Sequence, residues 1–182
     1  MSPAPIDTRS DQQLVEAING GELQAFDVLY FRHRDWTLRL ALRFTGHQDD
    51  ALDVLQETFA YLSRKFPGFV LTAALTTFLY PAVRNFSLAV RRRRQRATGN
   101  DELLPLIPAP TDSAVSSSEQ EREDWRSRFA SLSEEHQEVL LMRFVDGLTL
   151  SEIAAALELP SGTVKSRLHY AIQHARQLYR EE

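Results

Sequence analysis

Apolar residues recur at helical spacing near the C-terminus of the chain. From Leu148 to Ala171 the sequence reads LTLSEIAAALELPSGTVKSRLHYA, two short helical patterns that meet at Glu158-Leu159-Pro160. Thr149 and Glu152 stand three residues apart, which is the spacing of a capping box at the start of a helix. That helix ends before Pro160, because the residue that precedes a proline avoids the helical conformation. The pattern predicts a helix-turn-helix.

The second helix of this motif has two contrasting faces. Ser161 is placed to cap it. Its apolar stripe comprises Val164, Leu168, Ala171, Ala175 and Leu178. The opposite face carries Ser166, His169, Tyr170 and Gln173, with Lys165 and Arg167 at its flanks. Long cations suit phosphate oxygens and polar groups suit base edges in a major groove, so this face predicts a DNA contact. A helical hairpin with a solvated face is the alternative.

A third helix is expected just upstream, from Leu132 to Val145. Ser131 or Ser133 would cap it, and Gly147 would end it. Its candidate core residues are Val139, Leu140, Met142 and Phe144. Three helices of this kind can close a small domain.

In the first half of the chain, the pattern from Asp49 to Leu62 predicts a helix with one acidic face. The residues within one arc of roughly 120° on that helix are Asp49, Asp50, Asp53, Gln56 and Glu57. The opposite side is apolar and comprises Ala51, Leu55, Thr58, Phe59 and Leu62. The acidic face has three possible roles: a solvated surface, a docking site for a basic partner, or a set of carboxylate ligands for a metal ion. The last is the weakest fit, because adjacent turns of one helix converge poorly on an ion.

A second helix, from Phe78 to Arg96, ends in five arginines among six residues. If Thr76 or Thr77 caps it, Pro81 falls in the first turn, where a missing N–H costs no hydrogen bond. The arginines could form a solvated tail. Together with aromatic residues they could also grip phosphates and stack on exposed bases of melting DNA. The aromatic candidates are Phe78, Tyr80 and Phe86.

The composition agrees with a folded all-α protein: 43% of the 182 residues are apolar and 25% are charged. The chain has no cysteine, which excludes disulfides and zinc-thiolate sites, and its first residues do not resemble a secretory signal. The 18 uncharged residues 66–83 include two prolines and a glycine, which favours a loop and a helix over a membrane span. We therefore expect a cytoplasmic protein without membrane insertion.

Residues 98–118 gather three prolines and four serines, so they predict a flexible linker between two domains. Residues 7–96 carry 13 Lys and Arg against 10 Asp and Glu, while residues 97–124 carry 1 against 7. The net charge of −4 therefore comes mainly from the acidic linker. We expect domains at residues 8–96 and 125–182, joined by the linker at residues 97–124.

Taken together, these motifs resemble the extracytoplasmic-function sigma factors of bacterial RNA polymerase. DALDVLQETF at Asp50 to Phe59 is similar to that family's polymerase-docking helix, and FLYPAVRN at Phe78 to Asn85 to its minus-ten segment. GTVKSRL at Gly162 to Leu168 is similar to its minus-thirty-five recognition helix. The resemblance covers nearly the whole chain and implies a sigma region 2-like bundle followed by a region 4-like helix-turn-helix.

The resemblance also implies roles for particular residues. Docking on the coiled coil of the polymerase's largest subunit is implied for Asp50, Asp53, Gln56 and Glu57. Contact with the minus-ten element, including capture of a flipped base beside loop 66–77, is implied for Phe78, Arg84, Asn85, Arg91, Arg92, Arg93 and Arg94. Contact with the minus-thirty-five element is implied for Ser161, Thr163, Lys165, Ser166, Arg167 and His169. The expected partners are core RNA polymerase, through that coiled coil and the flap, promoter DNA, and an anti-sigma factor.

Five residues depart from the family pattern. Phe78 replaces a usual tryptophan, Pro81 a usual helix interior residue, Ala89 a usual aspartate, Glu158 a usual turn glycine, and Tyr170 a frequent arginine. The sequence has no P-loop, nucleophile elbow or Cys/His/Asp array. We therefore expect a specificity subunit that is not an enzyme and needs no cofactor or metal. The alternatives are a two-domain helix-turn-helix regulator that does not dock on polymerase, and a metal-dependent DNA-processing enzyme.

Overall fold

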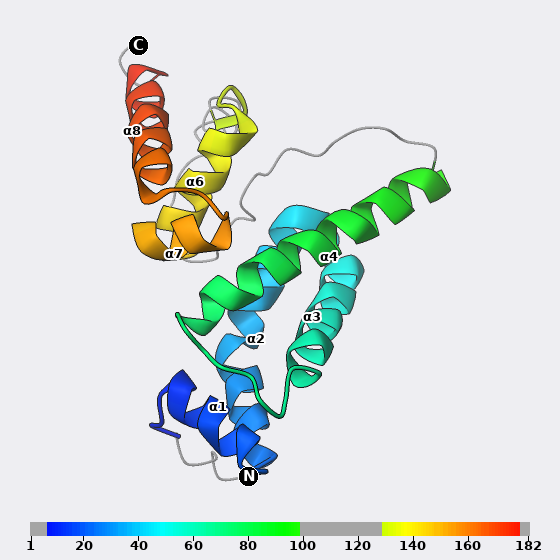
Figure 1. Ribbon diagram of the computed structural model, residues 1–182. Coiled ribbons are helices and arrows are strands. Elements are labelled where there is room, and N and C mark those ends of the chain that lie inside the picture. The colour runs from blue at the N-terminus through cyan, green and yellow to red at the C-terminus, as the bar shows by residue number, and fades with distance from the viewer. Residues whose placement is uncertain (1–6, 99–128, 179–182) are drawn as a thin grey trace.

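The computed structural model describes residues 7–98 and 129–178, and seven helices lie wholly within those ranges, where no strand occurs. The N-terminal domain comprises α1 (Asp11–Asn19), α2 (Gln24–Thr45), α3 (Gln48–Ser63) and α4 (Leu75–Thr98) (Figure 1). The C-terminal domain comprises α6 (Glu134–Phe144), α7 (Leu150–Ala156) and α8 (Ser161–Leu178). The predicted all-α fold is confirmed. Residues 99–124 of the predicted linker lie outside the described residues.

Helix α2 is central to the N-terminal domain, because α1, α3 and α4 all pack against it (Figure 1). The face of α3 predicted to be apolar is buried, as expected from its helical spacing. The core of this half is made of aliphatic and aromatic side chains at three- and four-residue intervals: Leu14, Val15, Ile18, Ala25, Leu29, Leu55, Phe59, Leu62, Leu75 and Leu79. Burying one face of α3 leaves its acidic face in solvent.

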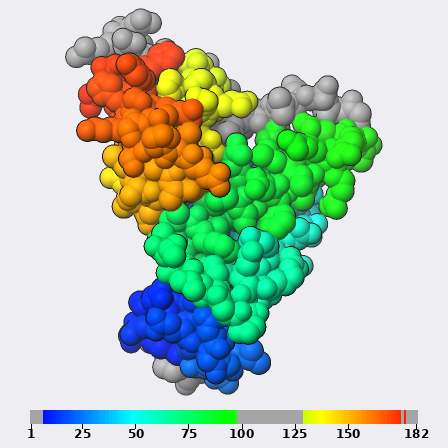
Figure 2. All heavy atoms as spheres, viewed as in Figure 1, coloured from blue at the N-terminus to red at the C-terminus, as the bar shows by residue number. Residues whose placement is uncertain are grey.

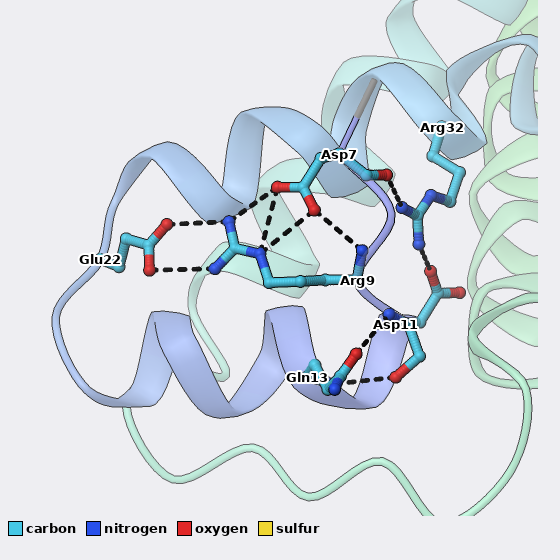
Figure 3. Close-up of polar contacts among 7 residues, drawn as sticks. Asp7, Arg9, Asp11, Gln13, Glu22 and Arg32 are labelled. Atoms are coloured by element: carbon cyan, nitrogen blue, oxygen red, sulfur yellow. Dashed lines mark hydrogen bonds and ion pairs between the residues drawn. The ribbon is translucent and has the colours of Figure 1, made fainter. Parts of the chain in front are cut away.

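Helix α1 is fastened to α2 by charged side chains (Figure 3). Arg9 donates to Asp7 at 2.7 Å and to Glu22 at 2.9 Å. Arg32 of α2 donates to Asp11 at 2.7 Å and to the backbone carbonyl of Asp7 at 3.1 Å. These bonds hold the residues that precede α1 against the start of α2. A capping box of Ser10 with Gln13 begins α1.

Helix α4 begins earlier than the sequence pattern suggests. Its first residue is Leu75, so Thr76 and Thr77 lie within the helix and Pro81 is in its interior. The prediction that Pro81 occupies the first turn is therefore wrong. An interior proline lacks one helical hydrogen bond. The helix continues because Leu79, Tyr80 and Val83, on both sides of the proline, are completely buried.

The C-terminal domain has the predicted helices, with two local differences. Ser133 is in the N-cap position of α6, and Val139 and Met142 are buried as expected, but Phe144 is 66% exposed. The assignment of Phe144 to the core is wrong: the buried apolar residues of α6 are Val139, Leu141 and Met142. The first backbone bonds of α8 reach the carbonyl of Pro160, so Ser161 is the first helical residue and not the cap.

The two domains share one hydrophobic core. Phe44 of α2 and Tyr80 and Val83 of α4 belong to the same buried cluster as Met142 of α6 and Ile153 of α7. In Figures 1 and 2, α7 accordingly lies next to α4. The sequence pattern predicts two modules but contains no sign of this packing, because each helix already shows a complete apolar face for its own domain.

Candidate polymerase and nucleic-acid interfaces

The acidic face of α3 is accessible. Asp49, Asp53, Gln56 and Glu57 are exposed, and Asp50 is partly covered. Three of the four residues that the resemblance assigns to docking therefore face solvent together. The fourth, Asp50, accepts a hydrogen bond from Arg94 at 2.9 Å. The exposed carboxylates can meet a basic partner without any movement of the helix.

The arginine-rich end of α4 lies alongside this acidic face. Arg92, Arg93 and Arg94 are exposed and Arg91 is partly exposed. Between α3 and α4 there is an open groove of about 440 Å³. The groove is lined by Glu57, Phe86, Ala89, Val90, Arg93 and Arg96. The structure thus places arginines and an apolar surface on the side of α4 that borders α3.

Arg84 and Asn85 lie nearer the middle of α4. Asn85 is exposed, whereas the Arg84 Nε donates to Glu138 of α6 at 2.8 Å. Glu138 also accepts from the Tyr80 hydroxyl at 3.3 Å. A predicted DNA-contacting arginine is therefore already bound to a carboxylate of the other domain.

The aromatic residues of α4 differ in their availability. Tyr80 is completely buried, so among the aromatic candidates for base stacking it belongs to the core. Burial, together with the nearby Glu138 carboxylate, raises the pKa of its hydroxyl well above the usual range. Phe78 is partly buried and stacks on Tyr61, with ring centroids 5.9 Å apart and planes within 7°. The Phe78 ring also contacts Phe69, with centroids 4.7 Å apart, so two aromatic neighbours cover part of it.

The polar face of α8 is exposed as predicted. Lys165, Ser166, His169 and Tyr170 face solvent, whereas Val164 and Ala171 on the opposite side are completely buried. Arg167, at the flank, pairs with Glu135 of α6 at 3.0 Å. The side chains of Ala175 and Leu178 lie outside the described residues. The arrangement can offer a polar helix face to a DNA groove.

The turn between α7 and α8 contains a residue in the left-handed conformation, as expected where Glu158 replaces the family's usual turn glycine. Glu158 has a φ of 54°, the left-handed region that usually requires glycine. The Glu158 N–H donates to the backbone carbonyl of Ala155, and the Leu159 N–H donates to that of Ala154. These two hydrogen bonds form a Schellman motif. The capping box of Thr149 and Glu152 is also present. Both ends of α7 are therefore closed by local hydrogen bonds, which sets the position of α8.

A buried ion pair joins the two domains, and the sequence pattern does not predict it. Arg43 of α2 donates to both carboxylate oxygens of Asp146, at 2.8 and 2.6 Å, and the two side chains are 3% and 6% exposed. Burial raises the pKa of Asp146, and the Arg43 hydrogen bonds oppose that shift. The two residues are 103 positions apart, so no local spacing signals the pair.

Within residues 7–98 and 129–178, no three His, Cys, Asp or Glu side chains come close enough together to hold a metal ion. In the same part of the chain, no helix has the length and apolarity that crossing a membrane requires.

Comparison with known proteins agrees with this architecture. Residues 29–97 match the family model of Sigma-70 region 2, and residues 129–177 match that of Sigma-70, region 4. The RNA polymerase sigma-H factor of Pseudomonas aeruginosa is 31% identical over 174 residues, which cover 88% of this chain and 89% of that protein. The ECF RNA polymerase sigma-E factor of Escherichia coli K12 is 30% identical over 175 residues, with 89% and 90% covered.

Two solved structures share the fold. CnrH in complex with the cytosolic domain of CnrY has a TM-score of 0.67 and 22% identity, with 94% of this chain and 98% of that chain covered. RpoE from Bartonella quintana, in complex with the anti-sigma factor NepR, has a TM-score of 0.62 and 20% identity, with 86% and 98% covered.

A chain with sigma-70 region 2 followed by region 4 is a sigma factor, the class of protein that starts transcription with RNA polymerase. Within that class, the chain belongs to the extracytoplasmic-function family. The resemblance of the sequence motifs to that family is thereby confirmed.

Proposed function

We propose that this sigma factor uses three helix faces in initiation: α3 docks on core RNA polymerase, α4 contacts the minus-ten element, and α8 contacts the minus-thirty-five element. The observation that carries the proposal is that the polar side of each helix is in solvent while its apolar side is buried. These faces can bind partners without unfolding. We expect domain limits at residues 8–96 and 125–182.

For docking, we assign the exposed Asp53, Gln56 and Glu57 as direct contacts, with Asp50 at their edge. Their partner would be the coiled coil of the polymerase's largest subunit, with the flap as a second contact for the C-terminal domain. A concentrated negative face favours a basic partner because complementary charges accelerate encounter and select against wrong partners.

For the minus-ten element, we assign Arg84 and the run of Arg91, Arg92, Arg93 and Arg94 to phosphates, since guanidinium groups bind phosphate oxygens with charge-assisted hydrogen bonds. Asn85 is exposed and can donate and accept hydrogen bonds at a base edge. Phe78, which is partly exposed, would contact a flipped base.

For the minus-thirty-five element, we assign the residues at and after the start of α8. These are Ser161, Thr163, Lys165, Ser166, Arg167 and His169. The recognition helix of a helix-turn-helix enters the major groove and uses its N-terminal residues on base edges. The exposed Lys165 and Ser166 are placed in that part of α8.

We further propose that the protein carries out no chemistry of its own and acts in the cytoplasm, where the polymerase works. An anti-sigma factor is proposed as its regulator. Bartonella RpoE, which shares the fold, was solved with such a partner.

The decisive test is reconstitution of the purified chain with core RNA polymerase on a library of promoter fragments. We expect core-dependent transcripts from a distinct subset of fragments. Transcripts no more specific than those of core polymerase alone would contradict the proposal. Specific duplex binding without polymerase binding would favour the helix-turn-helix regulator. Cleavage of DNA by the pure protein with Mg²⁺ would favour the metal-dependent enzyme.

A further inference from the structure

The last residue of α1 binds the loop that joins α3 to α4. The Asn19 Nδ2 donates to the backbone carbonyl of Phe69 at 2.8 Å, and the Asn19 Oδ1 accepts from the backbone N–H of Gly68 at 2.7 Å. A carbonyl only accepts and an N–H only donates, so the pair of bonds requires a side chain with a donor and an acceptor, such as an amide. Asn19 therefore holds the backbone of two consecutive loop residues.

This loop, residues 64–74, has few other polar restraints. Within the described part of the chain, no backbone N–H of residues 67–74 donates to a backbone carbonyl. Gly68 has a φ of 102°, a conformation that residues with a Cβ avoid. The two bonds from Asn19 are therefore the main polar restraint on the course of the loop.

Asn19 is itself held in one position at the end of α1. The Gly21 N–H donates to the carbonyl of Ile18 at 2.9 Å, and the Glu22 N–H donates to that of Ala17 at 3.0 Å. With Gly21 at a φ of 96°, these bonds form a Schellman motif. Ile18 is buried, and charged side chains fasten the other end of α1 to α2 (Figure 3). A side chain on a fixed helix end can hold a loop in one place.

The loop residue that Asn19 holds also contacts Phe78, which we assign to a flipped base. The ring centroids of Phe69 and Phe78 are 4.7 Å apart. Phe69 contacts Phe66 as well, with centroids 5.5 Å apart. Close-packed side chains transmit a displacement to their neighbours, so a shift of the Phe69 backbone would change the packing against Phe78. Only one residue therefore separates Asn19 from a proposed base contact.

The bonds from Asn19 select a loop conformation more than they add stability. Gly68 and Val70, on either side of Phe69, are exposed, and Val70 is 70% exposed. An accessible backbone group can bond to water instead, so its net gain from a protein partner is small. What the amide supplies is one fixed course for a loop that would otherwise have several.

We propose that Asn19 is a positioning residue for minus-ten recognition: it fixes the α3–α4 loop and, through Phe69, the ring of Phe78 that meets the captured base. This inference rests on the proposed function. It extends promoter reading to α1, which precedes the residues 29–97 that match Sigma-70 region 2. Asn19 acts through Phe69 and needs no contact with DNA.

The test is transcription by reconstituted polymerase from a barcoded promoter library that is randomised over both elements. The captured position is the one where Phe78→Ala lowers the base preference most. Asn19→Asp keeps an acceptor for Gly68 but replaces the donor to Phe69 with a carboxylate oxygen. It should lower the preference at the captured position by about three- to tenfold, the range expected for one lost hydrogen bond. Preferences in the minus-thirty-five element should not change.

A matched control lies on the same helix. Gln13→Glu makes the same change from amide to carboxylate, and the Gln13 Oε1 accepts from the Ser10 N–H at 2.8 Å, a bond that glutamate retains in a capping box. This variant should keep every wild-type preference. In the Phe78→Ala background, Asn19→Asp should cause no further loss at the captured position, because effects that pass through one residue are not additive.

Amide hydrogen exchange reports on the loop in the free protein. Asn19→Ala removes both bonds, so it should accelerate exchange of the Gly68 amide by about fivefold, as expected for one hydrogen bond of ordinary net strength. Asn19→Asp keeps the acceptor and should leave that exchange slow. Both variants should lower the preference at the captured position, and circular dichroism and binding to core polymerase show that each is folded.

Several results would overturn the inference. One is a folded Asn19→Asp variant, or a folded Asn19→Ala variant, with the wild-type preference at the captured position. Another is an equal loss of preference over both promoter elements, which would indicate general destabilisation. A third is a full Asn19→Asp effect in the Phe78→Ala background, and a fourth is unchanged Gly68 exchange in Asn19→Ala. Failure of the proposed function is recognised separately, by the absence of promoter-specific transcripts from the wild-type protein with core polymerase.

Discussion

Arg94 and Asp50 join the arginine-rich end of α4 to the acidic face of α3 through a hydrogen bond of 2.9 Å. The resemblance to the sigma family assigns Arg94 to DNA and Asp50 to polymerase, yet in the free protein they bind each other. A partly exposed ion pair contributes about 0–1 kcal/mol, so either partner can exchange it for another ligand at small cost. Of the four residues assigned to docking, Asp53, Gln56 and Glu57 are immediately available.

Because Asp50 is paired with Arg94 and Asp53 and Glu57 are exposed, substitutions at Asp53 and Glu57 should weaken docking more than a substitution at Asp50. Asp53→Lys together with Glu57→Lys should weaken binding to core polymerase by at least about tenfold, because like charges across an interface cost several kcal/mol. Asp50→Ala should have a smaller effect, since its carboxylate is already shared with Arg94. Binding is measured by fluorescence anisotropy of labelled protein. Glu16→Lys with Asp27→Lys makes the same charge change on α1 and α2 and should bind normally; equal weakening would show that only net charge matters.

A second prediction concerns the recognition helix. Arg167→Ala should weaken binding of the polymerase complex to its promoter by about 1–3 kcal/mol if Arg167 reads a guanine. Lys165→Ala should reduce the salt dependence by about 0.9 in the slope of log K against log salt if it contacts one phosphate of the duplex. Arg176→Ala, near the end of α8, is the matched control. If Arg167→Ala weakens binding to random duplexes as much as to the promoter, Arg167 is a phosphate contact.

A third prediction follows from the left-handed turn at Glu158. Replacing Glu158 with glycine should raise the free energy of unfolding by about 1 kcal/mol, because a Cβ in this conformation meets the following carbonyl oxygen. Glu158→Ala keeps the Cβ and should give no comparable gain. Urea denaturation of both variants measures the difference. A gain for alanine equal to that for glycine would mean that the glutamate side chain, and not backbone strain, limits stability.

A fourth prediction concerns acid. Hydrogen bonds from the Arg9 side chain lower the pKa of Asp7 from 3.8 to about 2, and the His33 hydrogen bond lowers the pKa of Asp11. A carboxyl whose folded pKa is lowered stabilises the fold above its unfolded pKa and loses that effect as pH falls through the folded pKa. The attachment of α1 should therefore weaken between about pH 4 and pH 2.

Amide chemical shifts of residues 9–19, followed by nuclear magnetic resonance, provide the measurement for this acid transition. Asp7→Asn should already shift these resonances at neutral pH and flatten their change below pH 4. Glu16→Gln, on the exposed side of α1, is the control and should titrate like the wild type. An unchanged titration in Asp7→Asn would show that the ion pair with Arg9 does not hold α1.

Most elements of the fold follow from short-range pattern. The capping box of Thr149 and Glu152, the buried face of α3 and the left-handed Glu158 each depend on residues within two helical turns, so the sequence contains all the information that they require. The errors occur where distant packing decides the outcome. Pro81 is tolerated inside α4 because buried neighbours on α4 hold the helix. The core of the C-terminal domain ends at Met142 on α6 and leaves Phe144 in solvent.

The sequence alone was sufficient to determine an all-helical protein, its two sets of helices, the acidic face of α3 and the polar face of α8, because helical periodicity places these side chains relative to their own axis. Tertiary structure alone decided which charges meet. Arg43 finds Asp146 and Arg84 finds Glu138 across more than 50 residues, since both pairs depend on how two completed domains pack. The buried cluster that joins α2 and α4 to α6 and α7 is a property of that packing.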